Sequence, residues 1–167
     1  MLFRSILRQI ETEIEAVRLD APEGKIELPV KLKVHNSIFV PLAKWSMLLA
    51  GNYRCITRGG IRTAKEAVLT NIEESRSVYN FVFDLCVKLG ANPNELVPFE
   101  KYAAAAQSLS RPASAARALF NGAPSIERAD KLVQLIARQK GLSHPVIDAN
   151  VTLVDELLEK NRRKAVL

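Results

Sequence analysis

A mostly apolar stretch at residues 44–55 (KWSMLLAGNYRC) contains two polar side chains suited to carbonyl chemistry. Lys44 supplies an ammonium group, which can hold a carboxylate and, where burial lowers its pKa, donate a proton to a carbonyl oxygen. Asn52 follows eight positions later, about 80° further round a regular helix, so that both side chains can reach one cleft. The alternative is a solvated Lys44 whose stem lies along the surface. Trp45 and Tyr53 are expected to pack in the core.

Three arginines, Arg54, Arg58 and Arg62, recur at intervals of four from the end of this stretch. Guanidinium groups pair bidentately with carboxylate and phosphate oxygens, so the three can clamp an anionic substrate or the phosphate of a cofactor. Arg58 is the candidate for the cofactor contact. The alternative is a solvated basic face that Gly59 and Gly60 interrupt.

The elements that position these side chains are predicted to be mainly helical. Apolar residues at helical spacing indicate an amphipathic helix over residues 1–17. Ser125 is the predicted N-cap of a later helix, with Glu127 in its first turn. A turn is expected at residues 63–69. The helices predicted after residue 36 cover about residues 41–58, 71–89, 99 onward, 112–120, 126–140 and 145 onward.

One segment has the pattern of a strand. Residues 25–34 (KIELPVKLKV) alternate apolar and polar side chains, and Pro29 places the predicted strand at a sheet edge. A single strand cannot satisfy its own backbone hydrogen bonds. Three arrangements are therefore open: a small hairpin with residues 16–19, pairing with a second copy of the chain, or a sheet that this chain lacks.

The composition is that of an ordinary globular chain. The 167 residues suit one domain, and 48% are hydrophobic and 25% charged, with a net charge of +6. Basic and aromatic residues are not interleaved and no apolar run is long enough to span a membrane, so we expect neither a nucleic-acid nor a membrane partner. Two cysteines (Cys55, Cys86) and two histidines (His35, His144) lack metal-ligand spacing, which predicts a reduced cytoplasmic protein without a metal.

The order of the helical motifs resembles that of the C-terminal helical domain of the ketopantoate reductase (2-dehydropantoate 2-reductase) family. Over about residues 40–160, KWSMLLAGN precedes a long helix, and RPASAARALFNGAPSIERADKLVQLIARQKGLSHPVIDANVTLV follows it. Trp45 matches the tryptophan of the family's W-x-K-L-x-x-N helix. Gly141 and Pro145 match its G-x-x-x-P.

The resemblance implies a mainly α domain over residues 37–167, with a fold like that of the 6-phosphogluconate dehydrogenase C-terminal domain. It also implies reduction of a small anionic 2-oxo acid with NADP, in pantothenate biosynthesis, by a homo-oligomer. No G-x-G-x-x-G follows a strand in this sequence. We therefore expect NADP only on a missing or separate Rossmann half, of which residues 1–36 would be the last helix and strand. The chain alone would not be catalytically competent.

Two catalytic positions of the family carry different residues here. The family's lysine, its proton donor and substrate anchor, falls on Met47, and its asparagine falls on Gly51. Lys44 and Asn52 are the displaced candidates for these roles.

The remaining positions predict substrate contacts. The family's substrate-binding serine falls on Ala113, beside Ser114, and the glutamate and aspartate of its T-E-x-D fall on Ser125 and Glu127. We expect Ser114, Ser125 and Glu127 to contact the substrate, with helix capping as the alternative for Glu127. The alternative for the whole chain is a non-enzymatic helical module for protein interaction or dimerisation.

Overall fold

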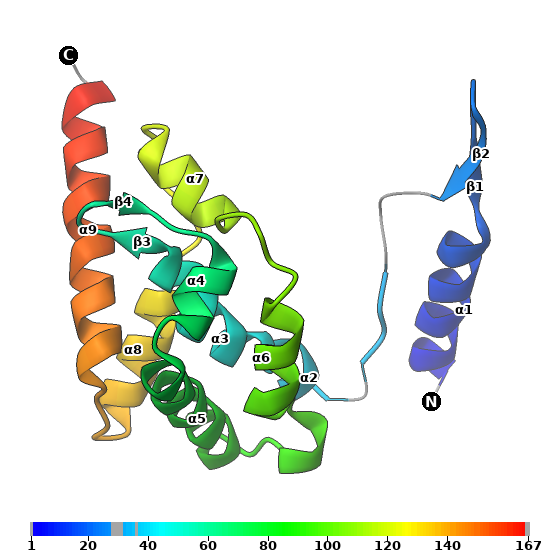
Figure 1. Ribbon diagram of the computed structural model, residues 1–167. Coiled ribbons are helices and arrows are strands. Elements are labelled where there is room, and N and C mark those ends of the chain that lie inside the picture. Colours follow the sequence, from blue (N-terminus) through cyan, green and yellow to red (C-terminus); the bar gives the residue numbers. More distant parts are fainter. Residues whose placement is uncertain (1, 28–31, 36, 166–167) are drawn as a thin grey trace. The chain divides into compact units, whose positions relative to one another are not determined.

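The chain is mainly helical and divides into two compact units, Met1–Ile38 and Phe39–Leu167 (Figure 1). The computed structural model describes residues 2–27, 32–35 and 37–165. Within these residues, no helix combines the length and the apolar character that crossing a membrane requires.

The N-terminal unit contains the predicted amphipathic helix, α1 (Leu2–Ala16), followed by an antiparallel hairpin of β1 (Arg18–Ala21) and β2 (Gly24–Glu27). The hairpin is the first of the three arrangements that the sequence left open. The prediction of one strand over 25–34 was too long: residues 32–35 have no regular structure, and residues 28–31 lie outside the described part. Gly24 has φ 120°, which the tight turn before β2 requires.

The second unit holds the remaining elements. They are α2 (Phe39–Leu42), α3 (Lys44–Met47), β3 (Ile56–Thr57), β4 (Gly60–Ile61), α4 (Ala64–Leu69), α5 (Ile72–Lys88), α6 (Phe99–Ala106), α7 (Ser114–Phe120), α8 (Ala129–Gln139) and α9 (Pro145–Ala165). In the middle of the unit, α5 packs against α4, α6 and the segment that follows α3, and α8 and α9 lie side by side (Figure 1).

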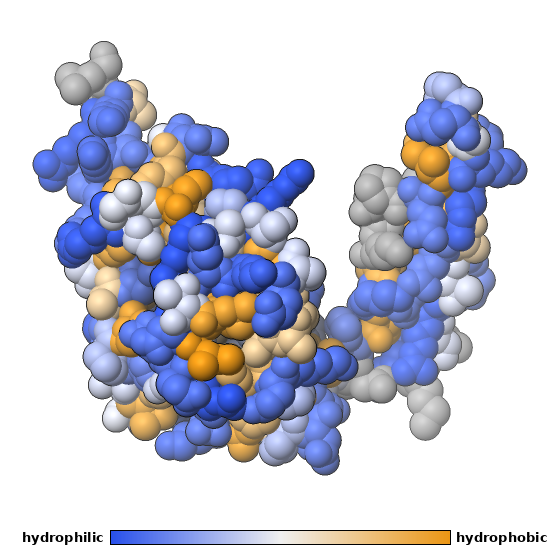
Figure 2. All heavy atoms as spheres, viewed as in Figure 1, coloured by the Kyte–Doolittle hydropathy of each residue, from blue (hydrophilic) through white to orange (hydrophobic). Residues whose placement is uncertain are grey.

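The core of this unit is built from helical stripes that the periodicity predicts. Val82 and Leu85 of α5 and Val154 and Leu158 of α9 are at most 1% exposed. Tyr79 of α5 stacks on Tyr102 of α6, with ring centroids 5.4 Å apart. Figure 2 shows a largely hydrophilic surface in which apolar residues form separate small patches, as expected once the stripes face inward.

The helix predicted over residues 41–58 is not continuous. After α2 and α3 the chain forms a π-helical turn (Leu48–Asn52) and a 3₁₀ turn (Tyr53–Cys55), and then enters the β3–β4 hairpin. β-Branched residues in β3 favour extended backbone, and Gly60 adopts φ 138°. Arg58 and Arg62, the basic residues that follow, therefore extend from a hairpin and not from one face of a helix.

Two other predicted boundaries were wrong. Residues 64–69 form a helix, α4, with Thr63 as its N-cap, and not a turn. The helix predicted over 126–140 begins at Ala129 with Arg128 as its N-cap residue, so Ser125 is not the cap. Of its apolar residues, Ala129 and Val133 are buried, whereas Leu132 is 49% exposed.

Candidate functional site

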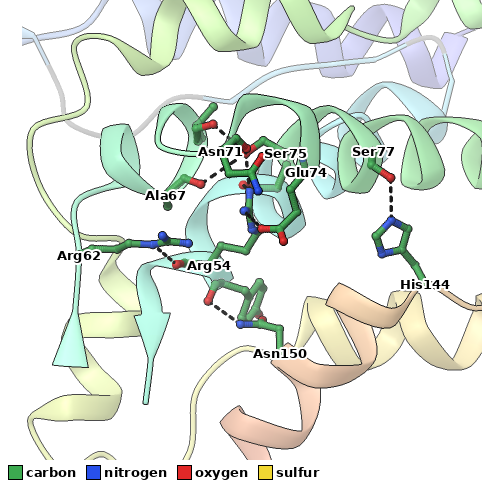
Figure 3. Close-up of polar contacts among 12 residues, drawn as sticks. Arg54, Arg62, Ala67, Asn71, Glu74, Ser75, Ser77, His144 and Asn150 are labelled. Atoms are coloured by element: carbon green, nitrogen blue, oxygen red, sulfur yellow. Dashed lines mark hydrogen bonds and ion pairs between the residues drawn. The ribbon is translucent and has the colours of Figure 1, made fainter. Parts of the chain in front are cut away.

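Among the residues that the structure describes, Arg54 is the one buried cation, with only 5% of its surface exposed. Its Nη1 donates to Ala50 O (3.1 Å) and Ser75 Oγ (2.5 Å), and its Nη2 forms an ion pair with Glu74 (Figure 3). Removing a guanidinium from water costs several kcal/mol unless hydrogen bonds and a counter-ion replace the water. These contacts supply that replacement and fix the direction of the side chain.

Arg62 reaches Arg54 through the β3–β4 hairpin. Its Nε donates to Arg54 O at 2.8 Å (Figure 3). Among the described residues, the two terminal nitrogens of Arg62 have no hydrogen-bond partner. Antiparallel pairing in the hairpin, not a shared helix face, thus brings Arg54 and Arg62 together across eight positions of the sequence. The half-buried Arg62 therefore has N–H groups from which a ligand oxygen can accept hydrogen bonds.

Arg58 lies in the turn of the same hairpin and is exposed. Its Nη1 lies 3.1 Å from Glu156 Oε2 of α9. An exposed ion pair of this kind contributes about 1 kcal/mol at most, so Arg58 can exchange it for a bound anion.

The three arginines line one groove of about 440 Å³ between the hairpin, α5 and α9. Asn150 of α9 lies on its wall, where Nδ2 donates to Tyr53 O at 2.9 Å (Figure 3). The charged lining residues are three arginines and one glutamate. Such a groove can hold a carboxylate or a phosphate through bidentate pairs. The lining residues are Arg54, Ile56, Arg58, Arg62, Glu74, Val146, Ala149, Asn150, Thr152 and Leu153.

The electrostatics of the groove favour an added anion. Burial lowers the pKa of Arg54, and the nearby charge of Arg62 lowers it further, whereas Glu74 raises it. The effect of Arg62 is repulsion between two like charges in a partly dry environment. A ligand oxygen between the two arginines would relieve that repulsion.

The two catalytic positions of the resembled family lie outside this groove. Met47 is half-buried and Gly51 is buried. Tyr102 OH donates to Met47 O at 3.1 Å, and this hydroxyl occupies the space that a Cβ at position 51 would need. A side chain at residue 51 therefore has no room to reach a ligand.

The displaced candidates do not share the arginine groove. Lys44 is exposed at the start of α3. Asn52 is half-buried and lines a second hollow of about 350 Å³ together with residues 108–113 of the loop before α7. Lys44 is not among the residues that line this second hollow. The regular helical turn that would have brought the two together is replaced by the π-helical turn.

The predicted substrate contacts Ser114, Ser125 and Glu127 are all exposed. Ser114 begins α7, next to the second hollow. Ser125 and Glu127 lie in the segment before α8, where the backbone oxygen of Glu127 accepts a hydrogen bond from Tyr53 OH (2.5 Å). The same hydroxyl accepts from Ala129 N (2.9 Å). Tyr53 thus acts in the core, as expected, and holds the start of α8.

Glu74 and Asn150 of the groove were not predicted from the sequence. Glu74 is twenty positions from Arg54, and Asn150 is ninety-seven positions from Tyr53. No local pattern links residues so far apart in the chain. The four-residue spacing of the arginines was the one available signal. In the described part of the chain, no three His, Cys, Asp or Glu side chains gather as metal ligands would.

Comparisons of this chain with protein-family models, with curated proteins and with solved structures gave no match.

Proposed function

We propose that the unit Phe39–Leu167 binds a small anionic 2-oxo acid in the three-arginine groove, as the substrate-binding half of an NADP-dependent reductase related to the ketopantoate reductases. The observation that carries the proposal is Arg62: its terminal nitrogens are without partners in the described structure, and it lies in a groove with Arg54 and Arg58. A carboxylate is the group that such donors hold best. The choice of a 2-oxo acid as the ligand, and of reduction as the reaction, rests on the resemblance in motif order.

NADP does not fit the described residues. The strands form two antiparallel hairpins, and Gly59 and Gly60 lie in the turn of the second one. A dinucleotide site instead needs a glycine-rich turn between a strand and a helix N-terminus. The proposed reduction therefore depends on a separate dinucleotide-binding half, and no step of it is assigned to this chain's residues.

Titration calorimetry with ketopantoate tests the proposal, with pyruvate as a shorter 2-oxo acid and inorganic phosphate as a second anion. The unmodified chain is expected to bind a 2-oxo acid with a Kd at or below the millimolar range. The variant Arg62→Gln removes the unpaired cation and should raise that Kd at least tenfold. The buried Arg54 is left intact, so the fold is retained.

Arg117→Gln is the matched control, because Arg117 of α7 is exposed and lies outside the groove. It changes the net charge equally and should leave the Kd unchanged. Equal weakening by both variants would mean that binding follows overall charge and would contradict the assignment to the groove. Stronger binding of phosphate than of any 2-oxo acid would contradict the substrate class.

The second candidate is a non-enzymatic interaction module. The observation that favours it is Tyr102, whose hydroxyl fills the space at Gly51 where the family has a catalytic asparagine. The same titration separates the two candidates. If no anion binds at millimolar concentration while the chain associates with itself, the interaction module becomes the better description.

A further inference from the structure

The groove of Arg54, Arg58 and Arg62 offers a ligand two cations, not three. Arg54 already has Glu74 as its counter-ion, so its charge is compensated within the chain. The terminal nitrogens of Arg62 have no partner in the described structure, and Arg58 has the exposed ion pair with Glu156. Arg58 and Arg62 are therefore the guanidinium groups that a bound anion can engage.

These two cations extend from different ends of the β3–β4 hairpin. Arg62 N donates to Cys55 O at 3.0 Å, so Arg62 lies opposite Cys55, just before β3. Arg58 follows β3, in the turn. Positions 55 and 58 are three residues of mostly extended chain apart, which is about 10 Å. The two side chains thus enter the groove from well-separated points.

Helix α9 packs against β3 and contacts both ends of the groove. Asn150 Nδ2 donates to Tyr53 O, which neighbours the carbonyl that Arg62 bonds (Figure 3). Six residues further along α9, Glu156 pairs with Arg58. Six helical residues rise about 9 Å, in agreement with the spacing along the hairpin. The two available cations therefore mark opposite ends of the groove.

Apolar side chains line the groove between its two ends. On the hairpin, Ile56 lies midway between Arg54 and Arg58 in the sequence and lines the groove. On α9, Leu153 lines it too, and the hydroxyl of the adjacent Thr152 donates to the backbone of its own helix. Methylene groups of a ligand would be covered there, because apolar surface gains free energy on leaving water. A cation, an apolar stretch and a second cation thus follow one another along the groove.

We propose that the groove takes an elongated dianion: a 2-oxo acid with a carboxylate at each end of a short methylene chain. One carboxylate pairs with Arg62, and the other displaces Glu156 from Arg58. The displacement costs little, because the side chains of Arg58 and Glu156 are 75% and 50% exposed and exposed ion pairs contribute little to stability. Glu156 therefore competes with the ligand for Arg58. This inference rests on the proposed 2-oxo acid function and narrows its substrate class.

Titration calorimetry on the full chain compares 2-oxoglutarate with 2-oxopentanoate, which has the same chain length but one carboxylate, and with sulfate, a compact dianion. 2-Oxoglutarate is expected to bind roughly tenfold more tightly than either, as one added charge-assisted pair would give. Equal Kd values for the two 2-oxo acids would overturn the inference and leave the proposed function standing. Sulfate binding as tight as that of 2-oxoglutarate would overturn the two-ended arrangement. No binding of either 2-oxo acid would overturn both the inference and the proposed function.

Two variants locate the second carboxylate. Arg58→Gln should raise the Kd of 2-oxoglutarate to that of 2-oxopentanoate, whose own Kd stays nearly unchanged. Glu156→Gln releases Arg58 and should tighten 2-oxoglutarate binding about twofold to fivefold, with little effect on 2-oxopentanoate. Glu159→Gln is the matched control, because Glu159 is exposed on the same helix and lies outside the groove. A preference that survives Arg58→Gln, or equal tightening by Glu156→Gln and Glu159→Gln, would overturn the inference.

Discussion

The Tyr102 side chain next to Gly51 is held in place by several contacts. Its ring stacks on Tyr79, its hydroxyl bonds Met47 O, and its residue surface is 6% exposed. The side chain therefore cannot swing away to admit a larger residue 51. This packing makes the position a structural one in this chain.

Gly51→Asn, which restores the asparagine of the resembled family, is expected to destabilise the chain by about 1–3 kcal/mol, because a Cβ would overlap the Tyr102 hydroxyl and meet Val68 Cγ2 at 3.2 Å. Urea unfolding measures this change in the free energy of unfolding. Gly59→Asn is the matched control, since nothing lies within 4 Å of a Cβ there, and it should change stability little. Combining Gly51→Asn with Tyr102→Phe should recover part of the loss; no recovery would show that the hydroxyl is not the obstacle.

His144 gives the stability a pH dependence. Burial lowers its pKa from the ordinary 6.5, and Arg54 adds to this, whereas Asp148 and Glu74 oppose it. Because the unfolded chain then binds the proton more readily than the folded chain, the free energy of unfolding rises with pH. The contribution of His144 is complete above pH 6.5 and is lost as the pH falls from 6.5 through the lower folded-state pKa.

His144→Gln is expected to flatten the fall in stability on acidification, because the amide does not titrate. Urea unfolding at about pH 7.5, 6.5 and 5.5 measures the slope. A variant with the same slope as the unmodified chain would assign the pH dependence to other groups.

The sequence predicted the arginine cluster but not the geometry of each member. Spacing alone suggested that Arg54, Arg58 and Arg62 act together, and one groove does contain them. Which of them is buried depends on Glu74 and Ser75, which only the fold brings to Arg54. Pairings of this kind are set by tertiary contacts, which a local pattern does not contain.

At the scale of elements, α4 depends on a capping box. Thr63 Oγ1 accepts a hydrogen bond from Glu66 N (3.1 Å), and Glu66 Oε2 accepts one from Thr63 N (2.8 Å). Thr63→Ala is expected to cost about 1 kcal/mol of stability, because it removes the hydroxyl oxygen that satisfies the backbone donor Glu66 N at the helix start. Thr63→Ser keeps the hydroxyl and should cost much less. Thermal or urea unfolding compares the two, and equal losses would point to the methyl group instead.

Long periodic helices were predictable, and irregular ones were not. The apolar stripes of α5 and α9 follow a strict helical period, so their existence could be read from sequence. The Thr63–Glu66 box has a known signature that would have identified α4. The breaks within residues 39–55 had no comparable signal, because the π-helical turn is determined by packing around Gly51 rather than by residue type.

At the scale of the whole molecule, the second unit contains the core by itself. Every buried hydrophobic residue of the described chain lies between Ala43 and Leu158. A chain of residues 39–167 is therefore expected to fold alone, with a melting temperature within a few degrees of that of the full chain. Circular dichroism during heating measures this. A chain that stays unfolded would show that the N-terminal unit contributes to the core after all.

The hydrogen bond from Arg62 to Arg54 O joins the groove directly to the buried part of the molecule. Any anion that binds there binds only the folded chain, so occupancy is linked to unfolding. At a hundred times its Kd, a ligand adds about 2.7 kcal/mol to the free energy of unfolding. For a unit of this size that is a rise in melting temperature on the order of 10 °C. A library of carboxylates and phosphates can therefore be ranked by thermal shift, and the natural ligand sought without any assay of turnover.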